Sequence, residues 1–166
     1  MTFFLLTAML WAGGAQTDAR HAIAAAYERA DAAYVAARTI ADLESIREWL
    51  DTPDCTYADF GQPPRQWAAM RAYAAEGLRT PIVSFHSRVQ QLDVNADRAT
   101  ATAIVTGVAH IVDRDGAFGP KGAAHDIETT ATVRDGWVRT DHWRRASHVK
   151  IVANRVTAVD AKPMNR

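Results

Sequence analysis

The sequence predicts an α+β fold in which three helices come first in the chain and an antiparallel sheet follows. Before residue 79 the apolar residues recur at helical spacing, as in Ile23, Tyr27 and Tyr34. From Ile82 onward apolar and polar residues alternate with period two, which is typical of strands that bury one face. Helices and a one-sided sheet pack as two layers, so we expect the helices to cover one face of the sheet.

The composition is that of one globular domain with a hydrophobic core. The chain has 166 residues, of which 48% are hydrophobic and 23% are charged. Basic and acidic residues both number 19, and no basic stripe stands out, so nucleic acid is not an expected partner. The single cysteine, Cys55, has no intrachain disulfide partner, and no Cys/His spacing resembles a structural zinc site.

The first fifteen residues differ from the rest because they are uncharged and apolar and end in small residues. This pattern is typical of a secretory signal with a cleavage point after Ala15, although no Lys or Arg precedes the apolar run. We therefore expect residues 1–15 to be a signal peptide and residues 16–166 to form one exported domain, periplasmic or secreted, without a membrane span. The alternative is an apolar first helix that packs in the core.

The first two helices meet at a capping signal. The segment TIAD at residues 39–42 fits a capping box, so the chain leaves the first helix there and begins a second. Leu43, Ile46 and Leu50 form the apolar stripe of this second helix. The helix ends near Pro53, because a residue before proline disfavours the helical region.

A short strand and a third helix come next. We expect a strand over residues 55–60, which ends at the turn-favouring segment GQPP at residues 61–64. The third helix is expected over residues 65–78, with Trp67, Met70 and Ala74 on its buried face.

The first hairpin of the sheet can be registered from its turn. An even loop near residues 95–98 pairs Val89 with Ile104 and Phe85 with Val108. Both pairs join apolar residues, which supports this register because a slip of one residue would turn every side chain to the other face.

The Asp135-Gly136 pair is the strongest hairpin signal in the chain, because both central residues of a type I′ turn need positive φ. A turn there pairs Val133 with Val138 and Thr129 with His142. The preceding Gly- and Pro-rich loop at residues 113–122, taken as symmetric, places His110 opposite His125. His110, His125 and His142 then share the apolar face of the sheet, which indicates a pocket.

The opposite face of the sheet carries most of the charged residues and is expected to face solvent or a second subunit. By the same register Trp137 and Trp143 lie on this face. Exposed aromatic residues of this kind are consistent with a homodimer contact through the outer face, although single exposed aromatics are common.

The order of these elements resembles the nuclear transport factor 2-like superfamily, which includes SnoaL-like cyclases, ketosteroid isomerase and scytalone dehydratase. The resemblance rests on Tyr27 and Tyr34 in the first helix, the segment WLDTPDCTYADFG at residues 49–61 and the closing Asp-Gly-Trp segment at residues 135–137. It covers about residues 20–150. It implies a cone-shaped roll, with the helices packed on a curved antiparallel sheet around an apolar cavity. Such folds host unrelated functions.

The resemblance also implies candidate catalytic residues. The segment DCTYAD at residues 54–59 is similar to the isomerase stretch that ends in the proton-shuttling Asp, which places Asp59 in that role. Tyr27 matches the tyrosine that helps to bind the oxyanion. The isomerase pairs that tyrosine with a carboxylic acid, but we find no strand Asp on the inner face, and His110 is the nearest candidate. A His with a carboxylate and a Tyr resembles the dehydratase branch more, in which a neutral His removes a proton and Tyr polarises a carbonyl.

The sequence thus leaves three interpretations open. The favoured one is an exported SnoaL-like domain that binds a small, largely apolar ligand; the alternatives are a cofactor-free lyase or isomerase, and a pocket filled by side chains. Asp59 also fits a turn residue and the tyrosines also fit core residues. Arg144, on the inner face by the same register, could anchor an anionic ligand or pair with Asp59. The candidates are Asp59, His110 and Tyr27 for catalysis, and His125, His142, Arg144, Tyr57, Tyr34 and Trp49 for ligand binding. No metal or cofactor is expected, because no carboxylate is registered among the three histidines.

Overall fold

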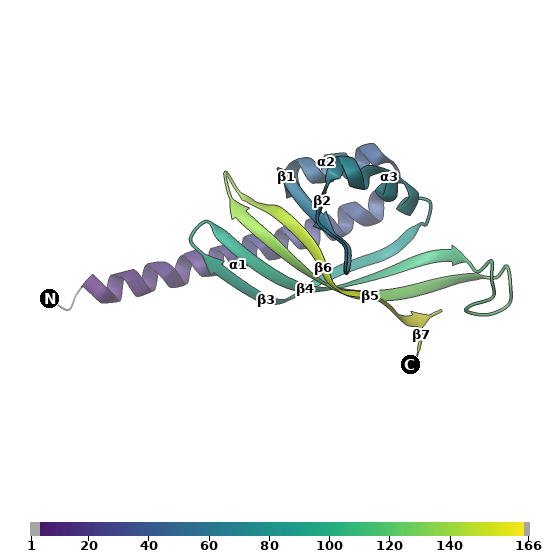
Figure 1. The fold of residues 1–166 in the computed structure, drawn as a ribbon. Helices are drawn as coiled ribbons and strands as arrows, with labels where there is room; N and C mark the ends of the chain where they lie inside the picture. The colour runs from purple at the N-terminus through teal and green to yellow at the C-terminus, as the bar shows by residue number, and fades with distance from the viewer. Residues whose placement is uncertain (1–3, 165–166) are drawn as a thin grey trace.

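The computed structural model describes residues 4–164, with side chains from residue 16 onward. The elements follow the expected order of helices and then strands (Figure 1). They are α1 (Phe4–Ala36), α2 (Ile40–Leu50), β1 (Asp51–Ala58), β2 (Arg65–Gln66), α3 (Trp67–Gly77), β3 (Ile82–Asn95), β4 (Arg98–Val112), β5 (Ala124–Arg139), β6 (Trp143–Val159) and β7 (Lys162–Pro163).

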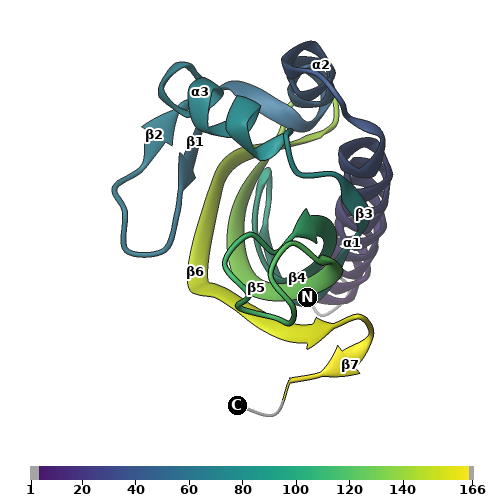
Figure 2. The ribbon, with the colours of Figure 1, turned by 90° about the vertical axis from the view of Figure 1, so that its right-hand side faces the viewer.

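The strands form one curved sheet with the order β2-β1-β6-β5-β4-β3, and β7 pairs with β6 at one end. All neighbours are antiparallel except β1 and β6, which run parallel, so the sheet is mixed. Figure 2 shows the sheet bending around the interior, with α1 along one side and α2 and α3 across the top. The predicted α+β roll is therefore confirmed, with three helices on a curved, mostly antiparallel sheet.

The helices begin, end and pack for the reasons that the sequence indicates. Thr39 caps α2, since its hydroxyl accepts from the Asp42 N–H at 3.2 Å while the Asp42 carboxylate accepts from the Thr39 N–H at 2.8 Å. On α1, Ile23 and Ala30 are buried against the sheet. The strand β4 contributes a row of small buried residues to the same core. This row consists of Ala99, Ala101 and Ala103.

The helix α1 is continuous from Phe4, and its first turns extend beyond the edge of the sheet (Figure 1). The side chains of residues 1–15 lie outside the described part, so the signal peptide stays a prediction. Within residues 4–164 no helix is both long enough and apolar enough to cross a membrane.

The predicted hairpin at Asp135-Gly136 is wrong. β5 runs straight through both residues, and the turn lies at residues 140–142, so Val133 pairs with Lys150 and Val138 with Arg144. Asp135 is completely buried on the inner face, and Gly136 does not have a positive φ. A Cβ on this glycine would lie 2.7 Å from Ser147 Oγ, so close packing across strands accounts for Gly136, and no turn is needed.

The predicted register of the first hairpin holds only near its turn. Asn95 pairs with Arg98, as an even loop requires, but the register shifts by one residue between Val89 and Gln91. Val89 consequently lies opposite Ala103, where Ile104 was expected, and Phe85 lies opposite Gly107. A β-bulge of this kind turns all subsequent side chains to the other face and leaves little trace in the sequence.

These shifts separate the three histidines that were expected to share a face. His110 pairs with Asp126, not with His125, and is half-exposed on the outer face. His125 is buried beneath the 113–122 loop, and His142 lies in the exposed turn after β5. The two tryptophans, Trp137 and Trp143, are buried in the core, so they do not support a homodimer contact through the outer face.

Candidate functional site

A cavity of about 500 Å³ lies between α1, α3 and the inner face of the sheet. Its walls are mainly apolar and aromatic, with Phe85, Val105, Ala131 and Val133 on the sheet side. None of the α3 residues is fully buried, and several of them line the opposite wall. A volume of this size suits a small organic molecule.

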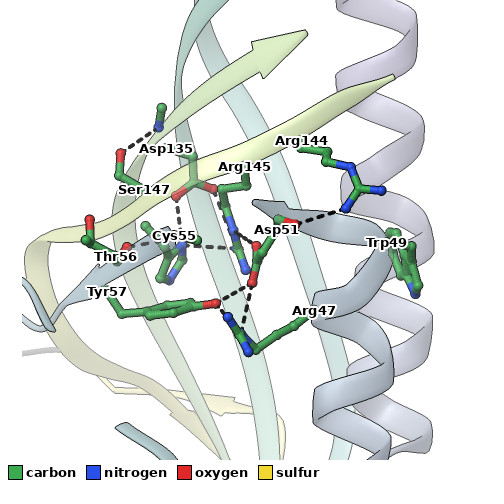
Figure 3. Close-up of polar contacts among 12 residues, drawn as sticks. Arg47, Trp49, Asp51, Cys55, Thr56, Tyr57, Asp135, Arg144, Arg145 and Ser147 are labelled. Atoms are coloured by element: carbon green, nitrogen blue, oxygen red, sulfur yellow. Dashed lines mark hydrogen bonds and ion pairs between the residues drawn. The ribbon is translucent and has the colours of Figure 1, made fainter. Parts of the chain in front are cut away.

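A buried charge cluster closes one end of the cavity. Asp51 begins β1 and lies beside Arg145 on β6, which in turn lies opposite Trp137 on β5. The Arg145 Nε donates to Asp51 at 2.8 Å, and Arg145 Nη1 is 3.9 Å from Asp135. Figure 3 shows the guanidinium between the two carboxylates. Both carboxylates have fully buried side chains, so the paired arginine is needed to offset the cost of their desolvation.

Three tyrosines meet this cluster and line the cavity. The Tyr27 hydroxyl donates to Asp135 at 2.6 Å, and the Tyr57 hydroxyl donates to Asp51 while it accepts from Arg47 Nε at 2.6 Å. Tyr34 differs, because its oxygen accepts from Arg145 Nη2 at 3.3 Å. That bond leaves its O–H proton available.

Burial dominates the protonation of these tyrosines. Burial and the adjacent Asp135 carboxylate raise the pKa of Tyr27 well above its ordinary value. Burial likewise raises the pKa of Tyr57, with Asp51 adding to the effect. Burial raises the pKa of Tyr34, although the charge of Arg145 opposes this. All three hydroxyls are therefore protonated at neutral pH.

His148 on β6 is the remaining polar residue at this end. Its Nδ1 lies 2.7 Å from Asp135 Oδ1 and 3.2 Å from Arg145 Nη1. An arginine N–H only donates, so the arrangement that satisfies the carboxylate has Nδ1–H donating to Asp135. The other ring nitrogen, Nε2, takes no part in these two contacts, and the residue lines the cavity.

The carboxylate of Asp135 is held in its charged form by these neighbours. Burial by itself would raise its pKa, but the His148 charge and hydrogen bond, Arg145 and the Tyr27 hydroxyl together lower the pKa below its ordinary value. Two carboxylates, Asp51 and Asp135, thus face two guanidiniums, those of Arg145 and Arg47.

Three of the nine residues predicted from the sequence meet at this cavity, namely Tyr27, Tyr34 and Tyr57. The other two predicted catalytic residues lie elsewhere. Asp59 is at the exposed end of β1, where Lys150 bonds to it at 2.9 Å and lowers its pKa. His110 pairs with Asp126 at 2.8 Å on the outer face. The structure therefore does not bring Asp59 and His110 together with Tyr27.

The remaining predicted ligand-binding residues have structural partners. His125 Nδ1 lies 2.8 Å from Asp160. His142 Nε2 bonds to the Trp49 carbonyl at 3.0 Å, and Arg144 donates to the Glu48 carbonyl at 2.8 Å. These last contacts hold the turn after β5 against the end of α2. The Trp49 ring stacks beneath Arg29 at 3.9 Å, away from the cavity.

The polar end also contains residues that sequence reasoning missed. Asp135 was interpreted as a turn residue because it precedes glycine, and Asp51 as part of a helix stop. Arg145 and His148 lie on β6, whose register shifts against β5 leave little trace in the sequence. One signal for Asp135 was available in the sequence. This residue belongs to the same alternating series as Ile127, Ala131 and Val133, and all four residues are buried.

Two further kinds of site were considered among the described residues, a cysteine nucleophile and a metal site. Burial raises the pKa of the Cys55 thiol to about 12, so it is protonated at neutral pH. Within residues 4–164 no group of three His, Cys, Asp or Glu side chains is placed to hold a metal ion.

Comparison with solved structures identifies the fold. A protein from Kribbella flavida superposes with a TM-score of 0.57 at 18% identity, over 87% of this chain and 95% of its own. A nuclear transport factor 2-like superfamily protein from Salmonella enterica gives a TM-score of 0.55 at 14% identity, over 84% of this chain and 94% of its own. A protein from Novosphingobium aromaticivorans, described as NTF2-like with a cystatin-like fold, gives a TM-score of 0.53 at 19% identity, over 86% of this chain and 87% of its own.

The chain therefore has the nuclear transport factor 2-like fold, as the sequence resemblance implied. At these identities the likeness extends to the fold alone. No protein-family model matches the chain, and no curated protein matches it.

Proposed function

We propose that the chain is an exported domain that binds a small, largely apolar molecule in the cavity between α1, α3 and the sheet. The observation that carries this proposal is the cavity itself, because about 500 Å³ enclosed by apolar walls and polar at one end is typical of a small-molecule site. The arrangement disfavours the interpretation of a pocket filled by its own side chains, since Trp67 and Phe85 line the space and leave it open.

Binding is tested with N-phenyl-1-naphthylamine, an uncharged apolar dye that fluoresces when it leaves water. We expect saturable binding at a single site. Ala131 is buried on the cavity wall, so Ala131→Phe places a ring in the ligand space and should weaken binding at least tenfold. Thr132→Phe is the matched control, because the next residue of β5 points to the other face. No saturable binding, or equal binding by Ala131→Phe and wild type, would contradict the proposal.

Export is the second part of the proposal and rests on the apolar, uncharged first fifteen residues. Expression of the full chain in a bacterium with two membranes should yield a periplasmic protein whose N-terminal residue is Gln16. A cytoplasmic protein that retains Met1 would contradict export and leave the ligand proposal intact.

A cofactor-free isomerase or lyase is the alternative, and one observation favours it. The bond between His148 Nδ1 and Asp135 orients the imidazole and leaves Nε2 as a base on the cavity wall. Such a base could move a proton from a carbon beside a carbonyl. The test is deuterium uptake from D2O into bound 2-tetralone, followed by NMR. His148→Gln should abolish uptake above background, while the exposed control His21→Gln should not; uptake no faster than in buffer would contradict catalysis.

A further inference from the structure

We propose that one corner of the cavity binds a ligand ammonium group, which pairs with the Asp31 carboxylate and lies against the rings of Tyr34 and Phe85. This inference rests on the proposed function, since it specifies the chemistry of the molecule that occupies the same cavity. Asp31 and Tyr34 belong to α1, and Phe85 belongs to β3. The carboxylates of the charge cluster, Asp51 and Asp135, belong to β1 and β5, so the ammonium would pair with a different acid.

Contacts between α1 and β3 build this corner, which we call the Asp31 corner and define by the cavity-lining residues Asp31, Tyr34, Phe85 and Ser87. The Asp31 carboxylate accepts from the Ser87 N–H at 2.6 Å and from the Ser87 hydroxyl at 2.7 Å. The rings of Tyr34 and Phe85 pack edge-on, with centroids 5.7 Å apart. Three residues separate the pair on the helix and two separate the pair on the strand, so each pair shares a face. The carboxylate and the rings are therefore neighbours on the cavity wall.

The Asp31 carboxylate is buried without a dedicated cation. The residue is 6% exposed, and its one ion pair among the described side chains is with His86 Nδ1, at 3.9 Å, on a side chain that is 73% exposed. Glu28 on the same helix adds negative charge nearby. Burial raises the pKa of Asp31, and the hydrogen bonds from Ser87 oppose that rise. A buried carboxylate in this position is stabilised by any cation that reaches it.

The hydrogen bonds from Ser87 leave room for a ligand. An ionised carboxylate has about four acceptor positions, and Ser87 occupies two of them. A ligand ammonium is both a donor and a cation, so it fills a free position and offsets the charge that burial penalises. Aromatic rings attract cations at their faces, so the adjacent rings of Tyr34 and Phe85 favour the same group.

The basic residues that line the cavity do not supply the missing cation. Three of them, Arg47, Arg145 and Lys150, already pair with other carboxylates. Arg38 is exposed, and its Nη1 donates to two carbonyls at the end of α1. Asp31 is the one carboxylate among the described lining residues. The buried charge that lacks a close counter-ion is therefore negative, which favours a cationic ligand over an anionic one.

The test compares four naphthalenes that differ in one substituent. Three differ only in whether the side-chain carbon bears an ammonium, a hydroxyl or a methyl group: 1-(2-naphthyl)ethylamine, 1-(2-naphthyl)ethanol and 2-isopropylnaphthalene. The fourth is the anion 2-naphthoate. Each displaces N-phenyl-1-naphthylamine at neutral pH, where the amine is protonated, and the dye affinity is measured for each protein. We expect the amine to bind about tenfold more tightly than each of the others, because only the ammonium forms a charge-assisted bond to the carboxylate.

The variants assign that preference to the carboxylate. Asp31→Asn removes the charge, keeps the size of the side chain and should abolish the amine preference while the dye still binds. Asp18→Asn removes an exposed acid of the same helix and should keep the preference. Ser87→Ala removes one hydrogen bond to Asp31 and leaves the charge, so it should also keep the preference. Loss of the preference in Ser87→Ala would mean that the carboxylate only holds α1 against β3, and would overturn the inference.

A measurement on the wild type keeps the test decisive if Asp31→Asn does not fold. The Ser87 amide donates to Asp31, so an ammonium that shares the carboxylate weakens that bond and should move the Ser87 amide proton signal upfield. 2-Isopropylnaphthalene has the same shape and no charge, so the difference between the two spectra isolates the contact. An identical Ser87 signal with both compounds overturns the inference.

The outcomes separate this inference from the proposed function. Equal binding of the amine, the alcohol and the hydrocarbon, or tighter binding of 2-naphthoate, overturns the ammonium inference while the apolar site stands. An amine preference that survives in Asp31→Asn also overturns it. Failure of the dye and of all four naphthalenes to bind overturns the proposed function as well.

Discussion

At the scale of single residues, the fold depends on how the fully buried Asp135 is satisfied. Tyr27→Phe removes one donor to this carboxylate and changes nothing else in shape. We expect a loss of about 1–3 kcal/mol in the free energy of unfolding, because a buried carboxylate is left with one partner fewer. Urea denaturation measures this loss. Tyr73→Phe, at an exposed tyrosine, should change stability by less than about 0.5 kcal/mol.

The same carboxylate predicts how stability depends on pH. The pKa of Asp135 is lower in the folded protein than in the unfolded chain, so below about pH 4 the unfolded chain binds the additional proton. The contribution of Asp135 is therefore complete above the unfolded pKa and is lost as the pH falls through the folded pKa. Asp135→Asn should flatten the acid limb of the stability curve, and the exposed control Asp18→Asn should not. Parallel acid limbs for wild type and Asp135→Asn would contradict this role.

The residues that the sequence predicted correctly are those whose pattern is local. Tyr27 and Tyr34 lie two helical turns apart on α1, so helical spacing alone placed them on one face, and both line the cavity. The role of Asp135 depends on partners 108 residues away on α1 and 13 residues away on β6. No local pattern contains those contacts, whereas the Asp-Gly pair suggests a turn at once.

At the scale of elements, the corrected register makes a prediction about Gly136. A Cβ at this position meets Ser147 Oγ at 2.7 Å, so Gly136→Ala should destabilise the protein by roughly 1–3 kcal/mol. In a Ser147→Ala background the nearest atom is removed, and the same substitution should cost much less. Denaturant unfolding of the four proteins in this double-mutant cycle measures the difference.

A type I′ turn at Asp135-Gly136 would give a different result. There the penalty would come from positive φ and would be equal in both backgrounds. Equal losses with and without Ser147 would therefore contradict the continuous strand.

The elements themselves were predictable because each has a strong signal. The capping box at Thr39 and the switch to period two at Ile82 both correspond to observed boundaries. The strand faces were not predictable, because the shift near Val89 and those along β6 depend on the curvature of the whole sheet. One inserted residue exchanges the two faces, and the shift in β3 therefore misplaced His110. Trp137 was misplaced by the turn predicted at Asp135-Gly136, because β5 continues through both residues.

At the scale of the whole molecule, the fold determines that a cavity exists and where its polar end lies. Residues of α1, α3 and the sheet line the cavity, and Figure 2 shows α1 along one side of the curved sheet and α3 across the top. The order of helices and strands sufficed to predict this cone. The chemistry inside it depends on Asp51, Arg145 and His148, whose positions follow from the parallel pairing of β1 with β6 and from the bulges.

The indole N–H signals of a ¹⁵N-labelled sample test the central claim most directly. Saturation with N-phenyl-1-naphthylamine should shift the signals of Trp67 and Trp137, because both residues line the cavity and the aromatic rings of the dye change the magnetic environment beside them. Trp143 is buried in the core and does not line the cavity, so its signal should stay unchanged and serves as the internal control. The account predicts shifts at Trp67 and Trp137 that saturate with the dye. No change at either residue would contradict binding in this cavity.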